Sequence, residues 1–216
     1  MKKNIYENPV IEFLDLVGKL IILNFCWMLC CIPVVTIGAA TSAMYSVMFK
    51  VVDDKERGTF LPYFKAFKDN FLQSTALWFI ISIAGLIFGF DLYYAVNDRY
   101  LINKAFLFIS IVGLMVLLNI LTLIFSLQAR YQNTVKNHLK NSLIIAYSSP
   151  LKIIMVWLVW ALPIVLTIYS ASFFRYFGFI WFVCGFSTLF YFSAKIIISI
   201  FRKINQEERQ KTDLNT

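Results

Sequence analysis

Charged residues are scarce in this sequence, and histidine occurs once. Charged side chains make up 15% of the 216 residues, well below the roughly 25% of soluble domains, while 60% of the residues are hydrophobic. This composition excludes a water-soluble fold. The formal net charge of +8 does not indicate nucleic-acid binding, because the Lys and Arg residues lie in short gaps between apolar runs, where they meet lipid headgroups.

The residue patterns of metal, cofactor and catalytic sites are also missing. The four cysteines lie within apolar runs without the paired spacing of zinc ligands, and the one histidine, His138, lies in a loop between runs. The sequence has no phosphate-binding glycine loop, no nucleophile elbow and no zinc-protease helix motif. We therefore expect no metal, no cofactor, no catalytic residue and no enzymatic activity.

Long uncharged runs are what the sequence has in abundance. A bilayer hydrocarbon core is about 30 Å thick and needs about twenty apolar helical residues to cross. We therefore predict an all-α fold, a polytopic transmembrane helical bundle of about five spans with short interfacial amphipathic helices. The spans are predicted near residues 20–49, 70–90, 105–129, 153–174 and 176–194. They belong to one transmembrane domain, residues 1–204, which is followed by a polar tail, residues 205–216.

The last two runs are separated only by Arg175. As one helix they would extend about 63 Å, twice the thickness of the hydrocarbon core. The chain must therefore turn between Ser170 and Gly178. We expect Arg175 to lie at a membrane interface, the alternative being an intramembrane charge that marks a transport pathway.

The first run is longer than one span requires. Its thirty uncharged residues would form a helix of about 45 Å, and Pro33 lies near the middle. The alternative is a hairpin of residues 20–32 and 35–49. One span is favoured, because each half of a hairpin would be short for a full crossing.

The distribution of Lys and Arg predicts the orientation. With five spans, fourteen of them lie on the side of the C-terminus and six on the other side. Cytoplasmic loops carry the excess of Lys and Arg, so the C-terminus is predicted to be cytoplasmic and the N-terminus extracytoplasmic. The hairpin alternative brings the N-terminus inside and changes the count to seventeen against three.

Amphipathic segments precede the first two spans. Residues 10–21 alternate apolar and charged positions at helical spacing, and the segment from Phe60 to Phe71 places aromatic residues beside lysines. We expect both to lie along the membrane surface as interfacial helices. The second segment also offers a candidate partner-docking surface, made of Tyr63, Phe64, Lys65, Phe67 and Lys68.

Polar and small residues inside the spans are candidates for helix packing or for a helix break. An amide in hydrocarbon requires a hydrogen-bond partner, and a packing role is favoured over substrate binding. Pairs of small residues, such as Gly85 with Gly89, allow helices to approach closely; packing within the chain is favoured over a homo-oligomer. The candidate helix-break or packing site consists of Asn24, Pro33, Thr36, Gly38 and Asn119.

Two stretches of the sequence are similar to a known family. LNFCWMLCCIPVVTIGAATSAMYSVMFK runs from Leu23 to Lys50, and FLPYFKAFKDNF runs from Phe60 to Phe71. They resemble the YesL-like family of small bacterial membrane proteins, whose hallmark is an LN-x-x-W start, a CxP-x-x-TIGAA centre and an FFKAFKxNF-like segment. Tyr63 stands where phenylalanine is usual, and a weaker likeness extends over residues 129–154.

The resemblance implies a bacterial plasma-membrane protein of unknown activity whose genes often accompany carbohydrate uptake systems, particularly ABC-type sugar transporters. We therefore interpret the protein as accessory to such a system, with the lipid bilayer and the permease subunits of the transporter as its partners. The alternative is a small stand-alone transporter or channel that acts as a monomer or a homo-oligomer. The features that favour this alternative are Pro33, Pro163, Asn119 and the glycine pairs.

Overall fold

The computed structural model describes residues 9–53, 58–97, 102–169, 175 and 178–214, and it is 94% helical. No strand occurs in these residues, and the predicted all-α helical bundle is confirmed. The helices are α1 (Pro9–Cys31), α2 (Ile37–Val52), α3 (Phe60–Asn97), α4 (Ile102–Arg130), α5 (Val135–Ser148), α6 (Pro150–Tyr169) and α8 (Phe186–Leu214). A short 3-10 turn, η2 (Val34–Thr36), precedes α2, and a π-helical turn, η3 (Trp181–Gly185), precedes α8.

Six helices in the described residues are long and apolar enough to cross a membrane, one more than predicted. The difference arises at Pro33, where the first apolar run divides into α1 and α2 instead of forming one span. The hairpin alternative is therefore the one that the structure adopts. Several such helices are what a multi-pass membrane protein requires.

The two predicted interfacial segments are not separate helices. Residues 10–21 are the first turns of α1, and the segment from Phe60 to Phe71 is the start of α3, which continues unbroken to Asn97. The spacing of apolar residues predicted helix correctly in both segments. No helix-ending residue separates either segment from the span that follows, so each continues into that span as one helix. The predicted turn between Ser170 and Gly178 lies almost wholly outside the described residues.

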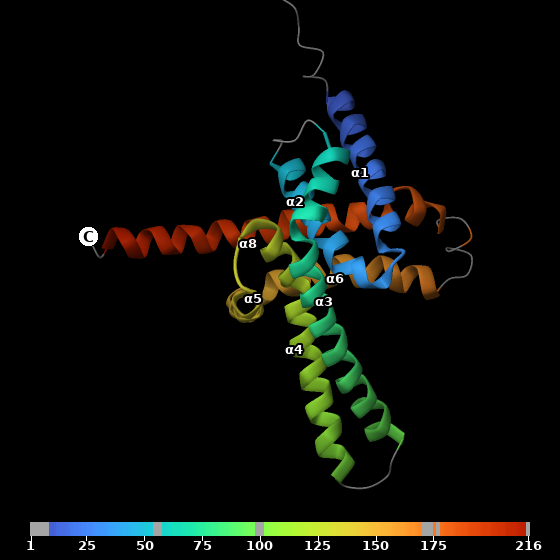
Figure 1. Cartoon of the computed structure of the whole chain (residues 1–216), viewed down its shortest axis with the longest axis vertical. Coiled ribbons are helices and arrows are strands. Elements are labelled where there is room, and N and C mark those ends of the chain that lie inside the picture. Colours follow the sequence, from blue (N-terminus) through green and yellow to red (C-terminus); the bar gives the residue numbers. More distant parts are fainter. Residues whose placement is uncertain (1–8, 54–57, 98–101, 170–174, 176–177, 215–216) are drawn as a thin grey trace, which may run out of the picture.

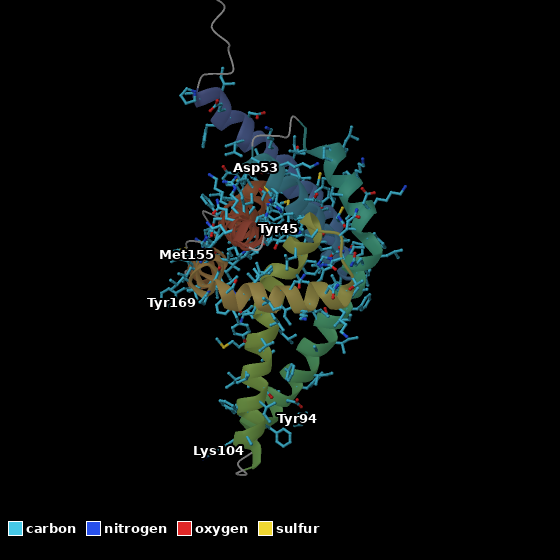
Figure 2. All side chains as sticks on the ribbon, turned by 90° about the vertical axis from the view of Figure 1, so that its left-hand side faces the viewer. Tyr45, Asp53, Tyr94, Lys104, Met155 and Tyr169 are labelled. Atoms are coloured by element: carbon cyan, nitrogen blue, oxygen red, sulfur yellow. The ribbon has the colours of Figure 1, made fainter. Side chains whose placement is uncertain are left out.

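Two helix pairs, α3 with α4 and α6 with α8, cross each other (Figure 1). α3 and α4 pack along each other parallel to the long axis of the molecule, and Tyr94 and Lys104 mark the far end of this pair (Figure 2). α6 and α8 also pack together, but α8 lies across that axis in Figure 1 and is seen end-on in Figure 2. Trp160 joins the second pair through a hydrogen bond from its Nε1 to Ser193 Oγ, 3.0 Å away.

The helix α2 lies between the two helix pairs. It packs against α1, α3, α4 and α8. In its most apolar stretch 67% of the residues are buried, against 11% in that of α3 and 28% in that of α4. Arg202 of α8 forms a 2.8 Å salt bridge with Asp53, directly after α2. The largest fully buried side chains around α2 include Leu23, Met44, Met48, Leu77, Leu123, Ile124, Ile197 and Phe201.

Candidate functional site

The break between α1 and α2 is stabilised by the hydroxyl group of Thr36. Pro33 lacks a backbone N–H and has extended dihedral angles, φ −75° and ψ 116°, so α1 cannot continue through it. The Thr36 hydroxyl lies 2.6 Å from the carbonyl oxygen of Cys30 and 2.7 Å from that of Pro33, and its single hydrogen is donated between these two acceptors. The carbonyl groups freed at the break therefore have a partner inside the chain.

Gly38 lies at a close approach of α2 to α3. A Cβ atom at this position would be 2.5 Å from the backbone oxygen of Ser74 and 2.8 Å from the Cβ of Trp78. Neither atom belongs to a flexible chain end, so a larger residue would force the two helices apart. One region therefore contains Pro33, Thr36 and Gly38. The first two residues lie at the break between α1 and α2, and Gly38 allows α2 to pack closely against α3.

Asn24 joins α1 to the last span. Its amide nitrogen donates hydrogen bonds to the carbonyl oxygens of Trp181 (3.1 Å) and Phe182 (2.7 Å), while its Oδ1 accepts one from the backbone N–H of Ser187 (3.0 Å). All of these acceptors and donors lie in or beside the π-helical turn η3, whose wide turn disturbs the α-helical pattern of backbone bonds. Asn24 is fully buried, and it supplies the partners that this irregular backbone needs.

Sequence reasoning named Asn24 but not its partner. The stretch around Trp181 reads as an ordinary apolar span, and π-helical turns have no residue pattern that could have located this one. The second amide, Asn119, is 8% exposed and donates to the carbonyl of Met115 one turn earlier in α4, at 2.8 Å. The two amides are thus used separately, Asn24 between helices and Asn119 within α4.

The predicted docking surface is divided by the fold. Tyr63 is fully buried, and its hydroxyl lies 3.3 Å from the carbonyl oxygen of Ala40, to which it donates. Phe67 is partly buried and packs against the core. Tyr63 therefore cannot belong to a docking surface, and Phe67 offers only part of its ring, which corrects the prediction for Tyr63. On a helix, residues four apart share a face, and this face packs on the core.

The exposed residues at the start of α3 form a different set. Phe64 is 37% exposed, Lys65 and Lys68 are exposed, and the ring centroid of Phe64 lies 4.9 Å from that of Phe60. Leu61, which the sequence analysis did not single out, is 77% exposed beside them. We call this set the α3-start surface: Phe60, Leu61, Phe64, Lys65 and Lys68.

The glycine pair in the second span does not serve helix packing. A Cβ atom at Gly85 or at Gly89 would meet nothing within 4 Å. No close helix approach is therefore made at these two residues among the described residues, although both are half-buried. The close contact between α3 and α4 is made by Phe88, whose ring lies against Gly113.

His138 is buried although it lies outside the membrane-spanning helices. It is 1% exposed on α5, its Nε2 has no hydrogen-bond partner among the described residues, and burial lowers its pKa. It lines a cavity of about 370 Å³ between α4, α5 and α8, together with Asn133, Asn141 and Asn205. The described residues contain no group of three or more side chains able to hold a metal ion.

The comparisons with known proteins bear on the first half of the chain. A family model described as a protein of unknown function, DUF624, matches residues 20–92. The match takes in the end of α1, the break at Pro33, all of α2 and most of α3. The comparisons with curated proteins and with solved structures found no match.

Proposed function

We propose that this protein is a YesL-like, non-catalytic membrane subunit that accompanies a bacterial carbohydrate uptake system of the ABC type. It would bind the permease subunits of that system through the α3-start surface. The single observation that carries the proposal is this surface, in which exposed rings and an exposed leucine lie beside two lysines at the end of a membrane-spanning helix. The identity of the partner is supported by the resemblance of the Leu23–Lys50 and Phe60–Phe71 stretches.

The chemistry of the α3-start surface suits a protein partner. Aromatic and large apolar side chains supply most of the energy at protein interfaces, and rim charges set the orientation of the partner. Phe60 is 54% exposed and Leu61 is 77% exposed, so both can be covered without unfolding any part of the chain. A permease segment that offers an apolar pocket flanked by acidic residues would be complementary to it.

The orientation that goes with this proposal follows from the hairpin of α1 and α2. If all six candidate helices cross the membrane, both termini and the start of α3 are on the same side, which carries seventeen of the twenty Lys and Arg residues. By the excess of positive charge, that side is the cytoplasm of the bacterial plasma membrane. Accessibility of single cysteines introduced near each terminus, in intact cells and in inverted vesicles, tests this orientation.

Photo-crosslinking in the native membrane tests the partner. A photoreactive phenylalanine analogue at Phe64 should form an adduct with a sugar-permease subunit, identified by mass spectrometry of the cross-linked peptide. The matched control position is Leu151, which is 74% exposed at the start of α6 and outside the α3-start surface. Adducts at Phe64 with lipid alone, or with a second copy of this chain alone, would contradict the proposal.

A pair of charge variants gives a second test. Phe64→Ser combined with Lys68→Glu should abolish recovery of the permease with the tagged protein, because the apolar contact is lost and the charge is reversed. Lys136→Glu, an exposed lysine in the first turn of α5, serves as the control with the same change of charge. Equal recovery with both variants would count against the α3-start surface.

The competing function is transport by this chain alone. The broken helix at Pro33 favours it, since interrupted membrane helices often line substrate sites in transporters. Solute flux into liposomes that contain only this protein distinguishes the two. Flux that is lost on Pro33→Ala or Asn119→Leu without loss of folding would support the stand-alone transporter and reject the accessory role.

A further inference from the structure

A cavity of about 750 Å³ opens where the end of α2, the start of α3 and the end of α4 meet. Its lining is unlike the apolar interior of the bundle, because it includes basic, acidic, amide and hydroxyl side chains. The lining residues that the argument uses are Ser46, Lys50, Lys65, Asp69, Gln128 and Arg130.

Three cationic side chains from three helices converge on this cavity. Lys50 comes from α2, Lys65 from α3 and Arg130 from α4, and all three are exposed at its mouth. One carboxylate, that of Asp69, lies among them. The excess of positive charge favours an anion, while the carboxylate can accept a hydrogen bond from a hydroxyl group of the same ligand.

The guanidinium group of Arg130 is held in place by aromatic rings. Its Cζ atom lies 5.4 Å from the ring centroid of Phe201 and 6.0 Å from that of Tyr131. A guanidinium that is already positioned loses little freedom when it binds, and its planar fork matches the oxygen atoms of a phosphate group. This arrangement favours phosphate over a simple halide ion.

Gln128 provides an observation that is independent of charge. The residue is 4% exposed and lines the cavity, yet neither its amide nitrogen nor its amide oxygen has a hydrogen-bond partner among the described residues. A buried amide without a partner destabilises a folded protein and is uncommon in native structures. A ligand that enters the cavity and bonds to this amide would remove that cost.

Two further serine hydroxyls, which do not line the cavity, are buried in the core between the same helices. Ser42 and Ser74 are both fully buried, and neither hydroxyl has a partner among the described residues. Ser42 lies one helical turn from Gly38, the point where the backbone of Ser74 and the ring of Phe125 come together. Gln128 lies three residues beyond Phe125, so unpartnered polar groups from α2, α3 and α4 occur at neighbouring levels of one three-helix contact.

We propose that this cavity binds a phosphate ester of a polyol, the chemistry shared by an anionic phospholipid headgroup and a free sugar phosphate. Lys50, Lys65 and Arg130 contact the phosphate oxygens, Asp69 accepts from a hydroxyl group, and the Gln128 amide bonds to the part of the ligand that enters deepest. Basic cavities between membrane helices are a recurring place for such headgroups. The proposal goes beyond the accessory role and does not depend on it.

Thermal unfolding of the purified full-length chain in a neutral detergent provides the test. The probes are glycerol 3-phosphate and short-chain dihexanoyl phosphatidylglycerol, each compared with dihexanoyl phosphatidylcholine and with sodium chloride at equal ionic strength. We expect at least one phosphate-bearing anion to raise the unfolding temperature in a saturable manner, since a ligand that binds only the folded state stabilises it. Stabilisation by the phosphatidylglycerol alone identifies a lipid headgroup, and stabilisation by glycerol 3-phosphate alone identifies a soluble ligand. If neither exceeds the salt control, the proposal is wrong.

Variants locate the binding. Lys65→Gln and Arg130→Gln should each weaken binding and raise the dissociation constant by about tenfold, the effect of one lost charge-assisted contact. Lys140→Gln, an exposed lysine of α5 that does not line the cavity, should leave the dissociation constant unchanged. Because Arg130 also packs on Phe201 and its loss could unfold the chain, the exposed Lys65 decides the outcome: an unchanged dissociation constant in Lys65→Gln overturns the proposal.

Gln128→Leu separates a ligand site from a structural amide. Without ligand, this variant should unfold at the same temperature as the wild type or higher, because it removes a buried group that has no partner. With ligand, its stabilisation should be smaller than that of the wild type. A lower unfolding temperature without ligand, or an unchanged effect of the ligand, would contradict the role of Gln128. Because these variants leave Phe64 and Lys68 intact, the two proposals can fail separately.

Discussion

Helix α2 and the far half of the α3–α4 hairpin are both apolar, but the structure uses them in opposite ways. The most apolar stretch of α4 is more hydrophobic than that of α2, yet 28% of it is buried against 67% for α2. The difference lies in side-chain size. The helix α2 presents Gly38, Ala39, Ala40 and Ala43 to its neighbours, and each of these alanines is fully buried.

The far half of the hairpin presents large side chains to its surroundings. Its exposed residues include Phe79, Ile83, Leu86, Ile87, Phe90, Phe108, Ile109 and Met115. In lipid, burial of a large apolar side chain against another helix brings no hydrophobic free energy, whereas small residues allow backbones to approach and make van der Waals contacts. Residue size, and not hydrophobicity, therefore marks the helix at the centre of this protein.

The largest expected effect comes from enlarging a small residue in α2. Gly38→Ala should lower the free energy of unfolding by about 3 kcal/mol, the upper part of the range for overpacking, because the new Cβ would meet a backbone oxygen. The measurement is denaturation in mixed detergent micelles followed by circular dichroism. Gly85→Ala in the hairpin is the matched control and should stabilise slightly, by up to about 1 kcal/mol, since the site is open and alanine favours a helix. Equal effects would remove the distinction between the two regions.

A buried amide is the next most sensitive position. Asn24→Leu should lower the free energy of unfolding by about 2 kcal/mol, because the backbone groups of Trp181, Phe182 and Ser187 lose their partner. Asn119→Leu should cost about 0.6 kcal/mol or less, the average for a polar contact in a membrane, because among the described residues its amide bonds within α4 alone. The same denaturation measurement applies. A larger loss in Asn119→Leu would show that this amide has a role beyond α4.

Removal of one hydroxyl group tests the α2–α3 contact more gently. Tyr63→Phe should lower the free energy of unfolding by about 1 kcal/mol, since it deletes the buried hydrogen bond to the Ala40 carbonyl. Tyr94→Phe, at the 67% exposed tip of the hairpin, should have no measurable effect. A stable Tyr63→Phe variant would mean that the ring of Tyr63, and not its hydroxyl, holds α3 against α2.

The smallest expected effect is a pH dependence from His138. Burial lowers the pKa of this side chain below its ordinary value of 6.5, so the unfolded chain takes up a proton first as the pH falls. Stability should therefore decrease as the pH falls through 6.5 and level off below the lowered pKa of the folded state. His138→Gln should remove this slope from a pH titration of the unfolding midpoint. A slope that survives the substitution would have to come from other groups.

The sequence was most informative in the long uncharged runs and at proline, whose ring restricts the backbone to few conformations. Uncharged runs of twenty residues or more predicted helices that the structure contains, and Pro33 predicted the position at which the first run could divide. In the described residues the structure has one candidate span more than the five that were favoured, because the length of each half of the first run was compared with a full crossing. In the structure, α1 starts at Pro9 and gains its length from the segment that was assigned to the membrane surface.

Contacts between distant residues were beyond prediction. Tyr63 and Phe64 are neighbours in one aromatic and basic segment, but only the position of α2 decides that the first is buried and the second exposed. The partner of Asn24 lies 157 to 163 residues away, in a π-helical turn that no pattern announces.

By itself, the sequence determined that the protein is all-α, that its helices are long and apolar enough for a membrane, and that the first run can break at Pro33. These features follow from local backbone preferences and from the cost of placing charge in lipid. Only the tertiary structure decided which helix lies at the centre, how the two helix pairs cross and how Lys50, Lys65 and Arg130 come to share one cavity with an unpartnered amide. The physical reason is that hydrophobicity drives a helix out of water and into lipid but does not select which other helix it packs against. That choice depends on the fit of side chains from segments far apart in the chain.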